Sequence, residues 1–139
     1  MVIDHIGIVV RSLEQGIRQW EELFGYARNS DIVTNTRQKV RVVFLNKKDS
    51  LTVKLLEPSE PDSSVSAFAS KGGGLHHICF RCGDLNTEIP ILKRKRVRLI
   101  VPPQPGEAFC DHDIAFLFAG NLNIELIDTS EKAGWLGPL

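Results

Sequence analysis

The 139-residue sequence lacks the features of several specialised protein classes. Its three cysteines, Cys79, Cys82 and Cys110, are odd in number and too few for a disulfide framework, so we expect free thiols and a cytoplasmic protein. Seventeen basic residues balance seventeen acidic ones, which gives no reason to expect a nucleic-acid partner. No apolar run approaches the roughly 20 residues of a membrane helix, and the first residues follow a strand pattern rather than a signal peptide. We therefore expect no membrane association.

The sequence does contain an internal repeat with a histidine near the start of each copy. Residues 4–10 read Asp-His-Ile-Gly-Ile-Val-Val, and residues 76–82 read His-His-Ile-Cys-Phe-Arg-Cys. His5 and His77 are 72 residues apart (77 − 5), and the same offset separates the leucines that follow at 13 and 85 (85 − 13). A constant offset over a strand and the next helix start predicts two equivalent folding units, each with one imidazole.

Apolar periodicity within each copy predicts a β-α-β-β-β unit. The strands expected are 2–10, 40–45 and 51–56 in the first copy, and 76–82, 97–101, 114–118 and 122–127 in the second. One helix follows Ser12, which can cap it, and another starts near Thr87, so that Pro90 falls in its first turn.

These patterns predict an α+β fold in which two β-α-β-β-β modules form a cupped mixed sheet around a pocket. We assign the modules to residues 1–58 and 75–128. Residues 59–74 are expected to be a linker with a short helix that points Val65 and Phe68 inward, and residues 129–139 a C-terminal tail.

Strand alternation predicts which side chains face the pocket. Successive side chains on a strand point to opposite faces, so placing the apolar residues against the helices leaves a polar set on the concave side. That set is His5, Lys54, His77 and Glu125, and Cys79 lies on the same face. Two neutral imidazoles and a carboxylate are good ligands for a divalent metal and leave positions open for substrate. By the same alternation, His76 is expected on the opposite face.

The chain resembles the vicinal oxygen chelate superfamily, the group of glyoxalases, bleomycin-resistance proteins and extradiol dioxygenases. Segments 4–10, 55–58, 74–80, 114–117 and 124–127 are especially similar to methylmalonyl-CoA epimerases and small glyoxalase-like proteins, and the likeness runs from about residue 2 to residue 128. The resemblance implies metal ligands at His5, His77 and Glu125, with a fourth ligand position at Lys54. It also implies a homodimer and metal-assisted isomerase or lyase chemistry on a small carboxylate or CoA thioester.

Two departures from the family pattern affect this pocket. Lys54 stands where the family carries Glu or Gln, and an ammonium group repels a metal instead of binding it. Epimerases of the family take a catalytic carboxylate from a stretch that corresponds to residues 35–40, which contain neither Asp nor Glu here. Arg37 and Gln38 occupy that place and become candidates for substrate binding, together with Cys79.

Three hypotheses for the pocket follow. In the first, His5, His77 and Glu125 hold Fe(II), as the triad of extradiol dioxygenases does, and Lys54 contacts the substrate. In the second, the protein is an isomerase or lyase with Glu125 as a catalytic residue, and Lys54 or His112 replaces the missing carboxylate. In the third, Lys54 pairs with Glu125, no metal is bound, and the protein binds a small molecule without chemistry.

Overall fold

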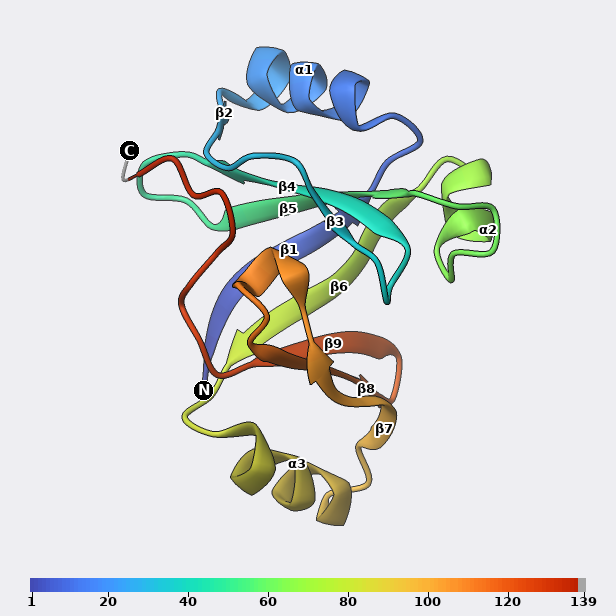
Figure 1. Cartoon of the computed structure of the whole chain (residues 1–139), viewed down its shortest axis with the longest axis vertical. Coiled ribbons are helices and arrows are strands. Elements are labelled where there is room, and N and C mark those ends of the chain that lie inside the picture. The colour runs from blue at the N-terminus through green and yellow to red at the C-terminus, as the bar shows by residue number, and fades with distance from the viewer. Residues whose placement is uncertain (138–139) are drawn as a thin grey trace.

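The computed structural model describes residues 1–137 as one mixed sheet with helices around it (Figure 1). The strands are β1 (Val2–Val9), β2 (Ala27–Arg28), β3 (Val33–Asn35), β4 (Val40–Asn46), β5 (Thr52–Pro58), β6 (Gly74–Arg81), β7 (Arg98–Pro105), β8 (Asp113–Ala119) and β9 (Leu122–Ile127). The helices are α1 (Leu13–Phe24), α2 (Ser66–Ser70), α3 (Leu85–Arg94) and the short 3-10 helix η1 (Glu107–Phe109). None of the helices in this described part is long and apolar enough to cross a membrane.

The sheet consists of two similar halves that meet at β1 and β6. Its strand order is β2-β4-β5-β1-β6-β9-β8-β7, and β3 pairs with β4. β1 pairs in parallel with β5, as β6 pairs in parallel with β9, while β1 and β6 are antiparallel to each other. α1 and α3 lie at opposite ends of the molecule, each covering its own half of the sheet (Figure 1). The predicted α+β class and cupped mixed sheet are confirmed.

The ends of α1 follow from its sequence. The Ser12 hydroxyl accepts a hydrogen bond from the backbone N–H of Gln15, at 3.2 Å, and so caps the start of the helix. Gly25 ends it in the left-handed conformation, with φ of 69°, which glycine adopts without steric cost. Both features agree with the sequence pattern.

The expected start of α3 near Thr87 is wrong. The Asp84 carboxylate accepts hydrogen bonds from the backbone N–H and the hydroxyl of Thr87, at 3.0 and 2.7 Å, and caps the helix at Leu85. Pro90 therefore lies inside the helix, beyond its first turn, on an exposed position. The side-chain cap fixes the helix start in spite of the backbone hydrogen bond that proline removes.

The predicted linker helix is present, but only one of the two residues expected to point inward is buried. Val65 is buried, as expected, whereas Phe68 is 39% exposed. The helix is only five residues long, and Ala69 takes the buried position in it. A single short turn can bury one narrow face only, so the expectation for Phe68 is wrong.

Three apolar clusters hold the elements together. One packs α1 residues such as Leu13 and Ile17 on the first half of the sheet, and another packs Leu85 and Ile89 of α3 on the second. The third fills the concave side between the halves and contains Val9, Val40, Val42, Phe44, Leu56, Cys79, Phe109, Ile114 and Ile127, among others. Polar side chains on this concave side are therefore surrounded by closely packed apolar groups.

The segment after β9 returns along the first half of the molecule (Figure 1). Trp135 forms an isolated β-bridge with Ser30, and the N–H of Ala133 donates to the carbonyl of Ala108 at 2.9 Å. These contacts place Lys132 next to the start of β1. The module and tail boundaries remain predictions, and the last two residues of the predicted tail, 138–139, lie outside the described part.

Candidate functional site

Two β-bulges position the histidines at the centre of the sheet. The β1–β6 register shifts by one residue between Ile3 and His5 and again between Gly7 and Ile8, which leaves Asp4 and His76 as the extra residues. Asp4 and His76 are 72 residues apart (76 − 4), so each bulge comes immediately before a repeat histidine. A bulge breaks the strict alternation of side chains and redirects them.

Gly7 provides the space that His77 occupies. Gly7 lies opposite His77 in the β1–β6 ladder, and a Cβ atom added at this glycine would lie 2.1 Å from Cε1 of the imidazole. No real Cβ contact is that short, so any larger residue would have to displace the ring. The glycine thus fixes where the second imidazole lies.

Lys54 and Glu125 complete the cluster from equivalent places in the two halves. Lys54 on β5 lies beside Gly7 of β1, and Glu125 on β9 lies beside Cys79 of β6. Gly7 and Cys79 are themselves related by the 72-residue offset (79 − 7). The structure therefore brings together the four side chains that alternation predicted: His5, Lys54, His77 and Glu125.

The Glu125 carboxylate is the centre of this buried cluster. Its Oε1 atom lies 3.0 Å from Nε2 of His5 and 3.2 Å from Nε2 of His77. The two Nε2 atoms are 3.4 Å apart. Nζ of Lys54 donates to both carboxylate oxygens at 3.4 Å. All four side chains are at most 1% exposed, so their charges interact with little screening from solvent.

The surroundings fix the protonation of the cluster. Burial opposes ionisation of Glu125, but the charge of Lys54 and the hydrogen bonds from both histidines hold the pKa of its carboxyl well below the usual value. Burial lowers the pKa of His77 to about 4, so this imidazole is neutral near pH 7. The cluster thus contains an ionised carboxylate and a neutral His77.

Acidic and basic groups behind the histidines orient their rings. Nδ1 of His5 lies 2.8 Å from Oδ2 of Asp4, and Asp4 is also contacted by Lys132, at 3.1 Å, and by Arg81, at 3.0 Å. Burial opposes ionisation of Asp4, yet the His5 hydrogen bond and the Lys132 charge leave its pKa lowered. Nδ1 of His77 lies 2.8 Å from Nδ1 of His76. Both imidazoles are therefore held from behind, with their Nε2 atoms towards Glu125.

The donor set matches a metal centre at three corners. Ligand atoms of His5, His77 and Glu125 lie within 4.8 Å of one another and could hold an ion. Metal–ligand bonds of about 2.1 Å separate neighbouring ligand atoms by roughly 3.0–3.4 Å, which the cluster's distances satisfy. At the fourth corner, however, the ammonium of Lys54 already pairs with the only carboxylate of the cluster. The residues therefore do not fit the four-ligand metal centre that the resemblance implies.

A small cavity of about 180 Å³ opens onto the cluster. It is lined by Asn35, Gln38, Val40, Lys54, Leu56, Ser64, Val65, His76, Ile100, Val101, Ile114, Phe116, Leu117, Asn123 and Glu125. Glu125 is the one acidic side chain among these lining residues. The cavity is mostly apolar and presents its charged groups on one wall, as a site for a small polar-headed group would.

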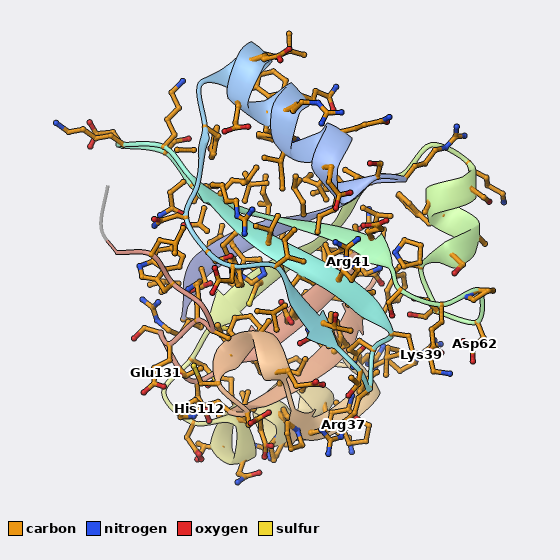
Figure 2. All side chains as sticks on the ribbon, turned by 45° about the horizontal axis from the view of Figure 1, so that its top comes forward. Arg37, Lys39, Arg41, Asp62, His112 and Glu131 are labelled. Carbon is orange, nitrogen blue, oxygen red and sulfur yellow. The ribbon has the colours of Figure 1, made fainter. Side chains whose placement is uncertain are left out.

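Of the other predicted binding residues, only Gln38 lines the cavity. Arg37 is exposed in the turn between β3 and β4, and Cys79 is buried in the central apolar cluster. His112 lies at the surface, where its Nε2 is 3.4 Å from Glu131 (Figure 2). The structure does not bring these three side chains to the cavity.

The sequence reasoning missed His76. Strict alternation predicts that His76 points away from His77, but its ring contacts His77 and lines the cavity, so that prediction is wrong. The bulge in β6 is the reason, because an extra residue in one strand lets neighbours share a face. The repeat, which aligns His76 with Asp4, was the available signal.

Comparisons with known proteins agree on the family. Residues 4–116 match the model of the Glyoxalase/Bleomycin resistance protein/Dioxygenase superfamily. The Bacillus subtilis protein YqjC is 35% identical over 133 residues, covering 95% of this chain and 93% of its own. Human mitochondrial methylmalonyl-CoA epimerase is 33% identical over 98 residues, which cover 69% of this chain and 54% of the human protein.

A solved structure gives the same result for the fold. A methylmalonyl-CoA epimerase in complex with methylmalonyl-CoA and NH4+ superposes with a TM-score of 0.80 at 27% identity, covering 95% of this chain and 97% of that one. The family model matches most of the sequence, and the fold resembles that of this epimerase. The chain belongs to the glyoxalase/bleomycin resistance protein/dioxygenase superfamily.

Proposed function

We propose that the protein binds the acyl group of a CoA thioester in the central cavity and exchanges the proton on its α-carbon, as an epimerase-like isomerase. The observation that carries this proposal is the pairing, on one cavity wall, of the ionised Glu125 carboxylate with the Lys54 ammonium. A carboxylate can accept a proton, and a cation can stabilise the negative charge left behind. The human and solved-structure relatives support a thioester as substrate.

The size of the cavity limits what it can hold. At about 180 Å³ it is smaller than the roughly 300–1,000 Å³ pockets that enclose drug-sized ligands. A short acyl chain fits such a volume, whereas the nucleotide of CoA has to lie outside. The apolar lining from residues such as Leu56, Ile114 and Phe116 favours a short alkyl substituent next to the reacting carbon.

The mechanism assigns separate roles to the two charged side chains. Glu125 accepts the α-proton, which is acidic because it is adjacent to the thioester carbonyl. Lys54 donates a hydrogen bond to the carbonyl oxygen, where negative charge develops as the proton leaves. The low pKa of Glu125 keeps it ionised at neutral pH but also makes it a weak base, so we expect slow turnover.

Binding without turnover is the second candidate. Inversion at carbon requires a proton to leave from one face and return to the other, but Glu125 is the only acidic residue lining the cavity in the described part. His76 is the remaining side chain on that wall that can carry a proton in both directions. A protein with one working base would exchange the α-proton with retention, and one with none would only bind.

The experiment is α-proton exchange in D2O, followed by mass spectrometry and by chiral analysis, on a panel of short branched acyl-CoA thioesters. We expect deuterium uptake with the wild type, at least 100-fold slower uptake in Glu125→Gln, and no change in Glu131→Gln, which makes the same substitution at an exposed site. Uptake that survives in Glu125→Gln refutes the role of that residue. Binding in calorimetry without uptake selects the second candidate, and failure of every thioester to bind refutes both.

Two further expectations from the sequence remain predictions. A homodimer is expected because the outer strands β2 and β7 leave sheet edges unpaired in the described chain. Analytical ultracentrifugation tests it directly. A cytoplasmic location is the other expectation.

A further inference from the structure

The carboxylate at the centre of the buried cluster already has a cationic partner without a metal. Glu125 contributes one negative charge and Lys54 one positive charge, and Nζ contacts both carboxylate oxygens at 3.4 Å. The second acidic group, Asp4, lies behind His5 and is matched by Lys132 and Arg81. A divalent ion at the centre would add two positive charges beside the Lys54 ammonium in a solvent-excluded site, which is strongly unfavourable.

Lys54 is held where it can act on a ligand. An ammonium group has three N–H donors, and both hydrogen bonds that Nζ makes within residues 1–137 go to Glu125. Lys54 is 1% exposed, lines the cavity, and has the ring of Phe109 5.0 Å from Nζ. One donor thus remains for an oxygen atom in the cavity.

We infer that the ammonium of Lys54 is the resident cation of this site, that it excludes divalent metals, and that it binds the substrate oxygen that a metal would otherwise hold. This inference deepens the proposed function and rests on it for the identity of the substrate oxygen. The exclusion of metal depends only on the cluster itself. The lysine at the corner equivalent to Glu125 is the feature that distinguishes this site from a two-histidine, one-carboxylate metal centre.

The inference predicts that one substitution creates a metal site. Lys54→Gln removes the positive charge and supplies an amide oxygen, beside three donor atoms that already have suitable spacing. Removing a unit charge about 4 Å from a divalent ion should raise the affinity by at least roughly a thousandfold, which is the factor for a singly charged ion at an effective dielectric constant of about 20. Lys54→Met, which lacks both the charge and the ligand oxygen, separates the two effects.

The test is Co²⁺ titration followed by visible absorption, with metal content measured after desalting. We expect wild type to retain less than about a tenth of an ion per chain and Lys54→Gln to bind about one ion, at least roughly a thousandfold more tightly. Lys54→Met should bind with intermediate affinity, and a second change, His77→Ala, should abolish binding in the Lys54→Gln protein. Lys48→Gln, in an exposed turn, is the control and should behave as wild type.

Each outcome of the Co²⁺ titration either supports or overturns the inference that Lys54 excludes metal. Stoichiometric Co²⁺ in the wild type overturns the inference, whether or not the variants fold. Folded Lys54→Gln and Lys54→Met proteins that both fail to bind Co²⁺ also overturn it, because the ammonium would then not be what excludes the ion. A wild type that excludes metal but exchanges no α-proton upholds the inference on metal and refutes the proposed reaction, so the two failures are distinguishable.

Discussion

Replacement of Gly7 by alanine tests how closely the strand packing fixes the position of His77. The added Cβ would lie 2.1, 2.4 and 2.5 Å from Cε1, Nε2 and Nδ1 of that imidazole. Ordinary contact begins at 3.4 Å, so the ring has to move by about 1.3 Å (3.4 − 2.1). That movement exceeds what the 3.2 Å contact between His77 and Glu125 can absorb. Overpacking of this kind costs about 1–3 kcal/mol, and loss of the buried contact places Gly7→Ala near the upper end.

Urea unfolding measures this cost, and Gly83→Ala is the matched control. Gly83 has nothing within 4 Å of an added Cβ and does not have a positive φ, so its replacement should change stability by less than about 0.5 kcal/mol. We expect Gly7→Ala to lower the free energy of unfolding by about 2–3 kcal/mol and to shift the His77 imidazole resonances in NMR spectra. Equal stability of the two variants, with unchanged His77 resonances, would refute the reasoning.

Two further predictions concern stability. Asp84→Ala removes the cap of α3 and should lower the free energy of unfolding by about 1 kcal/mol in urea titrations, whereas Glu22→Ala, an exposed change within α1, should cost less than half of that. Because burial lowers the folded-state pKa of His77 to about 4, below its ordinary value of 6.5, the unfolded chain binds the extra proton between these values. Stability should therefore be complete above pH 6.5 and fall by up to about 3 kcal/mol as the pH drops to 4, and a His77→Asn protein with the same pH slope would contradict this.

The sequence predicted the four corners of the site because they depend on two simple regularities. The repeat offset aligned His5 with His77, and strand alternation placed Lys54 and Glu125 on the same face. Strand alternation is a local property of the chain, and the 72-residue offset between the two histidines can be read directly from the sequence. These two patterns were therefore sufficient to predict that the four side chains lie together.

The features that the sequence did not predict depend on breaks in regularity or on distant contacts. A bulge in β6 places His76 in the cavity. The alternation of apolar and polar residues along that strand does not reveal the bulge. The contact between Lys132 and Asp4 joins residues 128 positions apart and exists only once the last segment docks. Arg37 and His112 lie outside the helices and strands, where sequence position does not determine which way a side chain points.

The opposite charges of Lys54 and Glu125 have a consequence for how such a protein can arise. The two residues lie at equivalent positions of two similar halves. In a dimer of identical half-length chains, symmetry would place the same residue at both positions, and two lysines or two glutamates would repel each other there. A single chain that contains both halves is free to vary each copy separately. A symmetric pair of identical half-length chains therefore could not contain this ion pair and would need another way to balance its buried charges.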